Sequence, residues 1–261
     1  MKPKVLVLKA DGTNRDEEMA YAFKLAGAEP EIVHVNILRN GMKKMSDYQI
    51  LALPGGFAYG DDIVSGKILA IELTSFLKKE MLNFIQRKDT AIIGVCNGFQ
   101  VLVRTGLLPF RKMGEMDATL TNNDSGHFEC RWIKVKANEK NQSPFLEDMR
   151  DEIIWLPVAH GEGKFLTDKE TLKKVEENNL VAFRYVDDNG NPTQDYPANP
   201  NGSLNAIVGV TDTTGRILGM MPHPECFIRV QQHPNWRRGS VKNPQGLPLF
   251  ENIVKFVKRV K

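Results

Sequence analysis

Residues 91–100 read AIIGVCNGFQ, and this segment decides the fold class more than any other part of the chain. An apolar run ends at residue 95, and a segment with helical spacing begins at Asn97. Cys96 stands at the junction between Gly94 and Gly98, which is the sulfur form of the GxSxG nucleophile elbow. Such a turn strains its central residue and leaves room only for glycine at the flanks. The segment therefore predicts a strand, a tight turn that presents a thiol, and a helix whose N-terminus favours the thiolate.

The alternation of strand and helix continues before the elbow. Short apolar runs typical of strands occur at residues 5–8, 31–35 and 50–53. Asn14 is predicted to cap a helix that Gly27 stops, and residues 68–85 have the spacing of one long amphipathic helix. Strands that alternate with helices indicate an α/β fold with a doubly wound, mostly parallel sheet flanked by helices, of flavodoxin-like type.

The second half of the chain is richer in β structure. Strand-like runs occur at residues 128–135, 153–158, 181–186, 206–211 and 217–221. One helix is expected at residues 169–177, and a closing amphipathic helix at residues 249–260. Residues 187–203 are rich in Pro, Gly and Asn and predict a long loop, because strand-like sequence resumes directly after them. We therefore expect residues 1–261 to form a single domain with extra β structure in its second half.

The composition excludes several classes of function. The 35 Lys and Arg residues against 32 Asp and Glu residues give a net charge of +3, which is too balanced for general attraction to nucleic acid or an anionic membrane. No apolar stretch approaches the roughly 20 residues of a membrane helix, and the run at residues 5–8 is too short for a signal peptide. Three cysteines without a CxxC pair indicate free thiols in a reducing compartment. The sequence predicts a soluble, cytoplasmic protein.

The segment MMPHPE at residues 220–225 follows the last predicted strand. Residues two apart point the same way in an extended chain, so His223 and Glu225 are expected to project together. A cysteine nucleophile needs a base for its proton, and the base needs an acceptor on its other ring nitrogen. His223 and Glu225 suit these roles. The sequence HPE alone is more often a surface turn, and it becomes a specific signal only in combination with the elbow.

The other cysteines and histidines are weaker candidates for catalytic residues. Cys130 lies in a strand-like run and is predicted to pack in the core, and Cys226 has no elbow. His34 and His233 are expected to be structural, whereas His160 in the segment PVAHGEG is left without a role. No pair of histidines has the spacing of metal ligands, so we expect no catalytic metal.

A glycine-rich loop, ALPGGFAYGDD at residues 52–62, overlaps the end of a predicted strand. Open α/β sheets bind ligands at the carboxyl ends of their strands, so the backbone N–H groups of this loop are candidates for an oxyanion hole. Phosphate binding is less well supported, because the chain has no GxxxxGK[ST] and this loop has no GxGxxG. Asp61 and Asp62 would point apart in an extended chain, which favours a solvated loop over a metal site.

In this order and across nearly the full chain, PGG, CxGxQ and HPE resemble the motifs of class I glutamine amidotransferases. Within that class, GGFAYGD, GVCNGFQ, PVAHGEG, PANPNGS and MMPHPE are similar to segments of the glutaminase subunits of phosphoribosylformylglycinamidine synthases. The pattern departs from the family at Val64 and Cys226, where arginine is more usual. By position, the resemblance implies the nucleophile Cys96, the base His223, its orienting carboxylate Glu225, oxyanion donors in the backbone of Gly56 and Asn97, and glutamine contacts at Gly55, Phe57 and Gln100.

The resemblance also implies the reaction and the partners. L-Glutamine would be hydrolysed through a Cys96 thioester, and the ammonia passed to a synthetase subunit (PurL), with a small bridging subunit (PurS), in purine biosynthesis. ATP and Mg²⁺ would bind to the synthetase, so no cofactor is expected on this chain. The alternatives are the glutaminase of another synthetase, a stand-alone cysteine hydrolase, and a non-catalytic binding module of the same fold.

Overall fold

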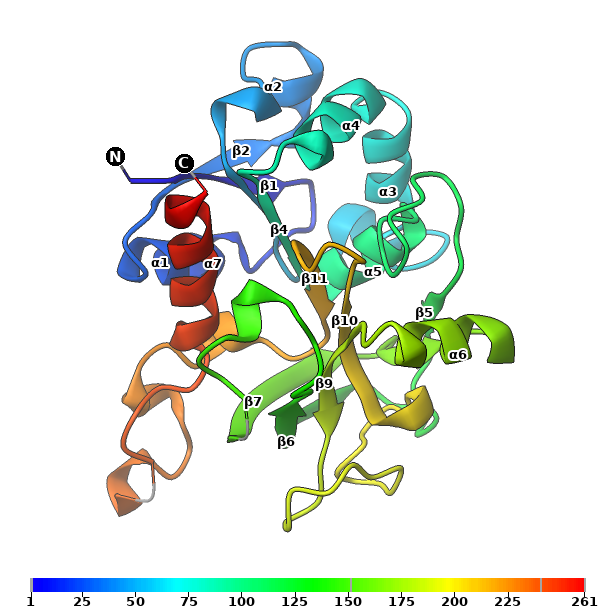
Figure 1. Ribbon diagram of the computed structural model, residues 1–261, viewed down its shortest axis with the longest axis vertical. Helices are drawn as coiled ribbons and strands as arrows, with labels where there is room; N and C mark the ends of the chain where they lie inside the picture. Colours follow the sequence, from blue (N-terminus) through cyan, green and yellow to red (C-terminus); the bar gives the residue numbers. More distant parts are fainter. Residues whose placement is uncertain (1, 151, 240, 261) are drawn as a thin grey trace.

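The computed structural model describes residues 2–150, 152–239 and 241–260. Its centre is a nine-stranded sheet with the strand order β2-β1-β3-β4-β11-β10-β9-β6-β7 (Figure 1). The first five strands are parallel neighbours: β2 (Glu29–His34), β1 (Lys4–Lys9), β3 (Ile50–Leu53), β4 (Ala91–Val95) and β11 (Ile217–Met220). Every residue of β3 and β4 is buried, as expected for parallel strands covered on both faces. The predicted parallel sheet is confirmed.

The β structure of the second half extends this same sheet. It consists of four antiparallel neighbours that continue from β11: β10 (Ile207–Thr211), β9 (Val181–Tyr185), β6 (Glu129–Ala137) and β7 (Ile153–His160). Two short strands that were not predicted, β5 (Thr119–Thr121) and β8 (Lys164–Leu166), form a separate antiparallel pair. Residues 187–203, all within the described range, form the predicted loop and contain no strand or helix.

Helices cover both faces of the sheet. On one face α1 (Asp16–Leu25) and α7 (Leu247–Arg259) lie side by side, and the rings of Phe23 and Phe250 meet edge to face at 5.0 Å between centroids (Figure 1). The remaining helices are α2 (Val35–Arg39), α3 (Lys67–Thr74), α4 (Lys78–Gln86), α5 (Asn97–Arg104) and α6 (Lys169–Glu177). Short 3-10 helices occur at Met45–Asp47, Ala58–Asp61, Pro144–Leu146, Leu204–Ala206, Pro224–Cys226, Val230–Gln232 and Trp236–Arg238. None of the helices in the described ranges is long and apolar enough to cross a membrane.

The prediction of one helix at residues 68–85 was wrong, because α3 and α4 are separate. Ser75 leaves the helical region with φ −111° and ψ −80°, and the Leu77 N–H donates to the Glu72 carbonyl at 3.1 Å, five residues back. The hydrogen-bond ladder therefore shifts by one residue at the break. The Thr-Ser pair at this point is a weak helix former, because hydroxyl groups compete for backbone partners.

The predicted cap at Asn14 was also wrong. Helix α1 begins at Asp16, and its N-cap Arg15 makes no side-chain capping bond. The backbone N–H groups of Asn14 and Arg15 instead donate to the Gly55 carbonyl at 3.4 and 3.2 Å. This segment therefore anchors the glycine-rich loop, which is a tertiary role that helix-start signals do not encode.

The topology brings three functional segments together at one edge of the sheet. Strands β3, β4 and β11 are adjacent, and Leu53 pairs with Gly94 while Met220 pairs with Val95. The glycine-rich loop follows β3, the elbow follows β4, and the HPE segment follows β11. Because parallel strands end at the same edge, segments that are far apart in the sequence become neighbours there.

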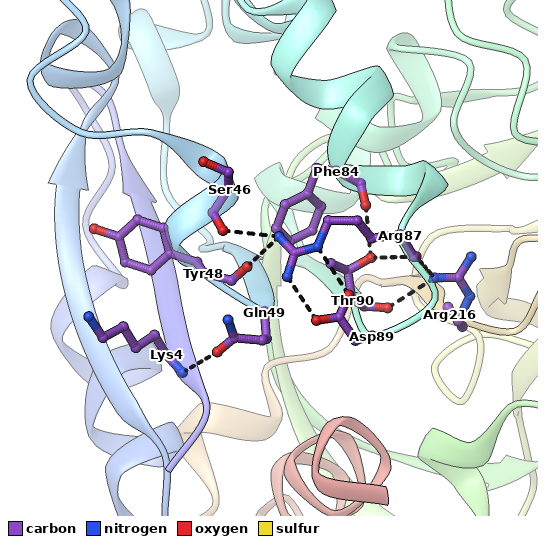
Figure 2. A network of polar contacts seen from close by, with 9 residues as sticks. All are labelled: Lys4, Ser46, Tyr48, Gln49, Phe84, Arg87, Asp89, Thr90 and Arg216. Carbon is purple, nitrogen blue, oxygen red and sulfur yellow. Dashed lines mark hydrogen bonds and ion pairs between the residues drawn. The ribbon is translucent and has the colours of Figure 1, made fainter. Parts of the chain in front are cut away.

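The opposite edge of the same strands carries a network of polar contacts (Figure 2). The Arg87 guanidinium donates to the carbonyls of Ser46 and Tyr48 at 3.2 and 3.0 Å and pairs with both carboxylate oxygens of Asp89. The Thr90 hydroxyl donates to the carbonyls of Phe84 and Arg87 at 2.9 and 3.0 Å. This network joins the end of α4 to the segments that lead into β3 and β4.

Candidate active site

The elbow has the geometry that its glycines predict. Cys96 has φ 52° and ψ −107°, a conformation that side chains rarely adopt, and its N–H donates to the Met220 carbonyl at 2.8 Å. A Cβ on Gly98 would lie 1.9 Å from the Leu53 carbonyl oxygen, and one on Gly94 would lie 2.5 Å from the Gly98 oxygen. Glycine is therefore required at both flanks, because the backbone of α5 touches β3 at Gly98 and β4 at Gly94.

The thiol of Cys96 is almost enclosed. The residue is 6% exposed, and its Sγ lies 3.6 Å from the Ala159 carbonyl oxygen at the end of β7. Cys96 also occupies the N-cap position of α5, where the helix dipole favours a negative charge. Little of the residue is therefore open to solvent.

His223 and Glu225 form a buried pair beside the thiol. The His223 Nδ1 lies 2.6 Å from Glu225 Oε1, and Glu225 is fully buried. The His223 N–H donates to the Pro157 carbonyl at 2.9 Å, which fixes this segment against β7. The two side chains meet as predicted, but the reason given was wrong, because residues 224–226 form a 3-10 turn and not an extended chain.

Electrostatics favour a charged His223. Burial alone would lower its pKa, but the negative charges of Glu225 and of a Cys96 thiolate outweigh burial and raise the pKa of His223 well above its ordinary value. Because Nδ1 is held by Glu225, the other ring nitrogen is the one that can exchange a proton with Cys96. That Nε2 atom is buried and has no hydrogen-bond partner among the described residues.

The glycine-rich loop packs directly on the imidazole. A Cβ on Gly55 would lie 2.7 Å from His223 Cε1, so a larger residue would displace the ring. Gly56 has φ +141°, and a Cβ there would lie 2.7 Å from the Asn14 nitrogen. Within the described ranges, the backbone N–H groups of Gly56 and Asn97 donate to no other protein group. These two N–H groups, which are the predicted oxyanion donors, are thus available to a ligand.

The side chain of Asn97 holds this loop against the elbow. Its Oδ1 accepts the Ala58 N–H at 3.2 Å, and its Nδ2 donates to Asp61 Oδ1 at 3.0 Å. Asp61 is half-buried with φ +54°, and burial raises its pKa. The expectation of a solvated loop was therefore wrong for Asp61, because the carboxylate turns inward to an amide donor that lies 36 residues away in the sequence.

Gln100 links the elbow to the PVAHGEG segment. Its Oε1 accepts from Asn97 Nδ2 at 2.9 Å, and its Nε2 donates to the Glu162 carbonyl at 2.7 Å. Both ends of the Gln100 amide are thus used by the protein, and its expected contact with glutamine stays a prediction. Phe57, another expected substrate contact, is 44% exposed and lies beside Phe128 with 6.4 Å between ring centroids.

The other two thiols differ from Cys96. Cys130 is exposed, so the prediction that it packs in the core was wrong: its neighbour Glu129 takes the inward position on β6. Cys226 is partly buried, and burial together with the Glu225 charge raises its pKa to about 12, which keeps it a neutral thiol. In the described part of the chain, one group of side chains could hold a metal ion, namely His223, Glu225 and Cys226, whose ligand atoms lie within 4.8 Å of one another. The absence of a catalytic metal remains a prediction.

Three of the other four histidines are hydrogen-bonded or buried, whereas His127 is exposed. His34 caps α2, because its Nδ1 accepts the Asn36 N–H at 3.3 Å. His233 is buried among aromatic rings, with its centroid 4.8 Å from that of Trp132 and 5.4 Å from that of Phe227. His160, which had no predicted role, is buried at the end of β7 beside the site.

Comparison with known proteins agrees with this geometry. Residues 2–257 match the family of CobB/CobQ-like glutamine amidotransferase domains. The phosphoribosylformylglycinamidine synthase subunit PurQ of Dehalococcoides mccartyi is 44% identical over 260 residues, which cover 99% of each chain. The subunit PurQ of Methanococcus maripaludis strain S2 is also 44% identical, over 97% of each chain.

A solved structure is similar over the same length. A chain in the structure of PurLQS from Thermotoga maritima superposes with a TM-score of 0.75 and 29% sequence identity, and the match covers 98% of this chain and 99% of that chain. The likeness therefore includes both the parallel sheet and its antiparallel extension.

Proposed function

This chain belongs to the family of CobB/CobQ-like glutamine amidotransferase domains, and from that premise we propose that it is the glutaminase subunit of a phosphoribosylformylglycinamidine synthase. The observation that carries the proposal is the site itself: a strained thiol at an elbow, a buried His–Glu pair 2.6 Å apart, and two unused backbone N–H groups meet at the ends of three adjacent strands. The full-length similarity to subunits named PurQ supports this assignment over the glutaminases of other synthetases.

The proposed reaction uses each of these groups once. The Cys96 thiolate attacks the carboxamide carbon of L-glutamine, and the backbone N–H groups of Gly56 and Asn97 stabilise the oxyanion. His223 gives a proton to the leaving nitrogen, the C–N bond breaks, and ammonia departs. Water then hydrolyses the γ-glutamyl thioester, which yields glutamate and restores the thiol. Glu225 stabilises the imidazolium throughout.

The product requires a partner. Free ammonia in neutral water is mostly protonated and no longer nucleophilic, so it must pass along a closed path to its acceptor. We propose that a synthetase subunit (PurL), bridged by a small subunit (PurS), receives it and converts formylglycinamide ribonucleotide to formylglycinamidine ribonucleotide in the cytoplasm. ATP and Mg²⁺ would bind to that partner, with no cofactor on this chain. The structure of PurLQS, which contains a similar chain, supports this assembly.

The intact Cys96, His223 and Glu225 disfavour a non-catalytic module. The test is reconstitution with the synthetase and the small subunit, followed by measurement of glutamine-dependent and ammonia-dependent product formation. We expect both nitrogen sources to work. A complex that uses only ammonia would contradict the glutaminase assignment, and glutaminase activity without this product would favour a different synthetase.

The burial of Cys96 also predicts that docking activates the enzyme. Since the thiol is 6% exposed and the oxyanion donors lie on a glycine-rich loop, the isolated chain should hydrolyse glutamine slowly. Adding the synthetase with its nucleotide ligands should raise kcat more than it lowers KM. Steady-state kinetics with and without the partner decide this, and equal kcat values would show that the chain needs no activation.

A further inference from the structure

The imidazole of His160 is held in one tautomer by Asn123. The Asn123 Nδ2 donates to the carbonyls of His127 and His160, both at 2.8 Å, so the orientation of this amide is fixed. Its Oδ1 accepts the Gly163 N–H at 3.0 Å and lies 3.1 Å from His160 Nδ1. An oxygen at that position can only accept, so Nδ1 of His160 carries the proton and Nε2 carries a bare lone pair.

That lone pair is buried without a partner. His160 is 2% exposed, and its Nε2 makes no hydrogen bond within the described ranges. Burial first, and the nearby His223 cation second, lower the pKa of His160 to about 4, so the ring is neutral at neutral pH. Buried acceptors are nearly always satisfied, because leaving one unpaired costs free energy. An unused acceptor beside a reactive site therefore points to a ligand that supplies the missing N–H.

The ring is also close to the reactive groups, because the His223 cation is near enough to lower the pKa of His160. His160 ends β7 directly after Ala159, whose carbonyl oxygen is 3.6 Å from Cys96 Sγ, and β7 also accepts the His223 N–H through Pro157. The ring is packed tightly, because a Cβ on Gly163 would lie 2.5 Å from both His160 Nδ1 and Cε1. Turning the ring away would also break the hydrogen bond between Nδ1 and Asn123 Oδ1.

We infer that Nε2 of His160 accepts a hydrogen bond from an N–H group of bound glutamine, which makes His160 a further residue of the substrate site. This inference rests on the proposed glutaminase function. Two groups of glutamine carry N–H donors, namely the carboxamide and the α-ammonium. If the donor is the carboxamide, the same acceptor would hold the departing ammonia, and a ring with so low a pKa would have no proton to give to it.

Two isosteric variants separate the two ring nitrogens. His160→Asn places an amide NH₂ near the position of Nδ1 and keeps the bond to Asn123, but it removes the acceptor at the Nε2 position. His160→Gln reaches the Nε2 position with an amide oxygen and restores an acceptor there. In the assembled complex, we expect His160→Asn to lower kcat/KM for glutamine by about 10- to 100-fold and His160→Gln to recover most of that loss.

A purely structural role predicts the opposite order, because it depends on the contact between Nδ1 and Asn123. The inference is overturned if His160→Asn is as active as the wild type or if His160→Gln is the weaker variant. Both variants should keep ammonia-dependent synthesis, which shows that the complex is intact. A wild-type complex without glutamine-dependent synthesis would instead refute the proposed function.

A second substrate identifies the donor. Glutamate γ-methyl ester has the α-ammonium of glutamine but no N–H on its leaving group. If His160→Asn hydrolyses the ester as well as the wild type does, the carboxamide is the donor. If the loss persists with the ester and His160→Gln restores hydrolysis, the donor is the α-ammonium. A loss with the ester that His160→Gln does not restore would overturn the inference.

Discussion

The two edges of the parallel strands differ in how their polar side chains are hydrogen-bonded. At the amino edge, the guanidinium of Arg87 reaches two carbonyls and a carboxylate, and the Thr90 hydroxyl is also paired (Figure 2). At the carboxyl edge, four buried side-chain atoms make no hydrogen bond among the described residues, although Glu162 Oε2 lies 4.0 Å from the Arg104 guanidinium: Nε2 of His160 and His223, and Oε2 of Glu162 and Glu225. The Arg87 and Thr90 groups at the amino edge are thus paired, whereas the groups around the reactive thiol keep unused capacity for hydrogen bonds.

Backbone strain is concentrated in the elbow and the loop that packs on it, although it is not confined to them. Positive φ angles occur there at Cys96, Tyr59, Asp61 and Ile63, and elsewhere in the described residues at Arg111, Asn179, Asn205 and Ala206. Such conformations are unfavourable for residues with a Cβ and persist only where the surroundings enforce them. The comparison teaches that polar pairing at one edge stabilises the fold, while the other edge holds strained and unpaired groups in position for a substrate.

The largest effect should come from Cys96→Ala at the carboxyl edge. Removing the nucleophile should lower glutamine-dependent synthesis by more than about 10³-fold while ammonia-dependent synthesis stays intact. The measurement is product formation by the complex with each nitrogen source. Residual glutamine activity near that of the wild type would remove Cys96 from the mechanism.

The same position should dominate chemical labelling. A glutamine-mimicking alkylator should modify Cys96 far ahead of Cys226, which is a neutral thiol, and ahead of the exposed Cys130, which has no base beside it. Mass spectrometry of labelled peptides gives the ratio. Labelling mainly at Cys226 would speak against the assignment.

A smaller effect is expected from Glu225→Gln, which keeps the shape of the side chain but removes the charge that stabilises imidazolium. We expect a loss of about 2 to 4 kcal/mol in transition-state stabilisation. Since Cys96, His223 and Glu225 act as a unit, adding this change to Cys96→Ala should cost little more. An unchanged kcat in the single variant would show that Glu225 does not support the base.

At the amino edge, Arg87→Met should lower the stability of the protein and leave its activity unchanged. The carbonyls of Ser46 and Tyr48 would lose their donor, so the free energy of unfolding should fall by about 1 to 3 kcal/mol with kcat unchanged. Denaturant unfolding measures the first quantity and glutaminase kinetics the second. Arg259→Met is the matched control: its exposed ion pair with Glu147 should contribute under about 0.5 kcal/mol. A loss of kcat in Arg87→Met would mean that the two edges are coupled.

The last prediction concerns pH and His160, and its effect is confined to acid solution. The pKa of His160 falls to about 4 in the folded protein, below its ordinary value of 6.5. Between these pH values the unfolded chain binds a proton at His160 and the folded chain does not. The free energy of unfolding therefore falls as the pH falls from 6.5 to 4, by up to about 1.4 kcal/mol per pH unit. His223 has the opposite sign, because its raised pKa gives stability that is lost as the pH rises. The difference in the free energy of unfolding between the wild type and His160→Gln should change with pH only between pH 6.5 and 4. A difference that stays constant over this range would contradict a depressed pKa of His160.

Much of the fold could be predicted because its signals are local. The bounds of β3, β4 and α6 were predicted to the residue, since uninterrupted apolar runs and helical spacing describe strands and helices directly. The elbow was predictable for the same reason, because Gly94 and Gly98 flank Cys96 at fixed positions and mark where the helix backbone touches the neighbouring strands. The split between α3 and α4 was missed, because both sides of Ser75 keep apolar spacing and only the hydrogen-bond ladder reveals the break.

The sequence by itself determined the strands of the parallel sheet and the strained thiol, because each depends on residues within a few positions of one another, and the combination of motifs identified the base and its carboxylate. Only the tertiary structure decided which polar groups are paired. Asp61 turns inward to Asn97, Gln100 reaches the Glu162 carbonyl, and Asn123 selects the tautomer of His160, across 36, 62 and 37 positions. Whether a buried polar atom finds a partner depends on groups that the fold brings close, and spacing along the chain does not encode that proximity.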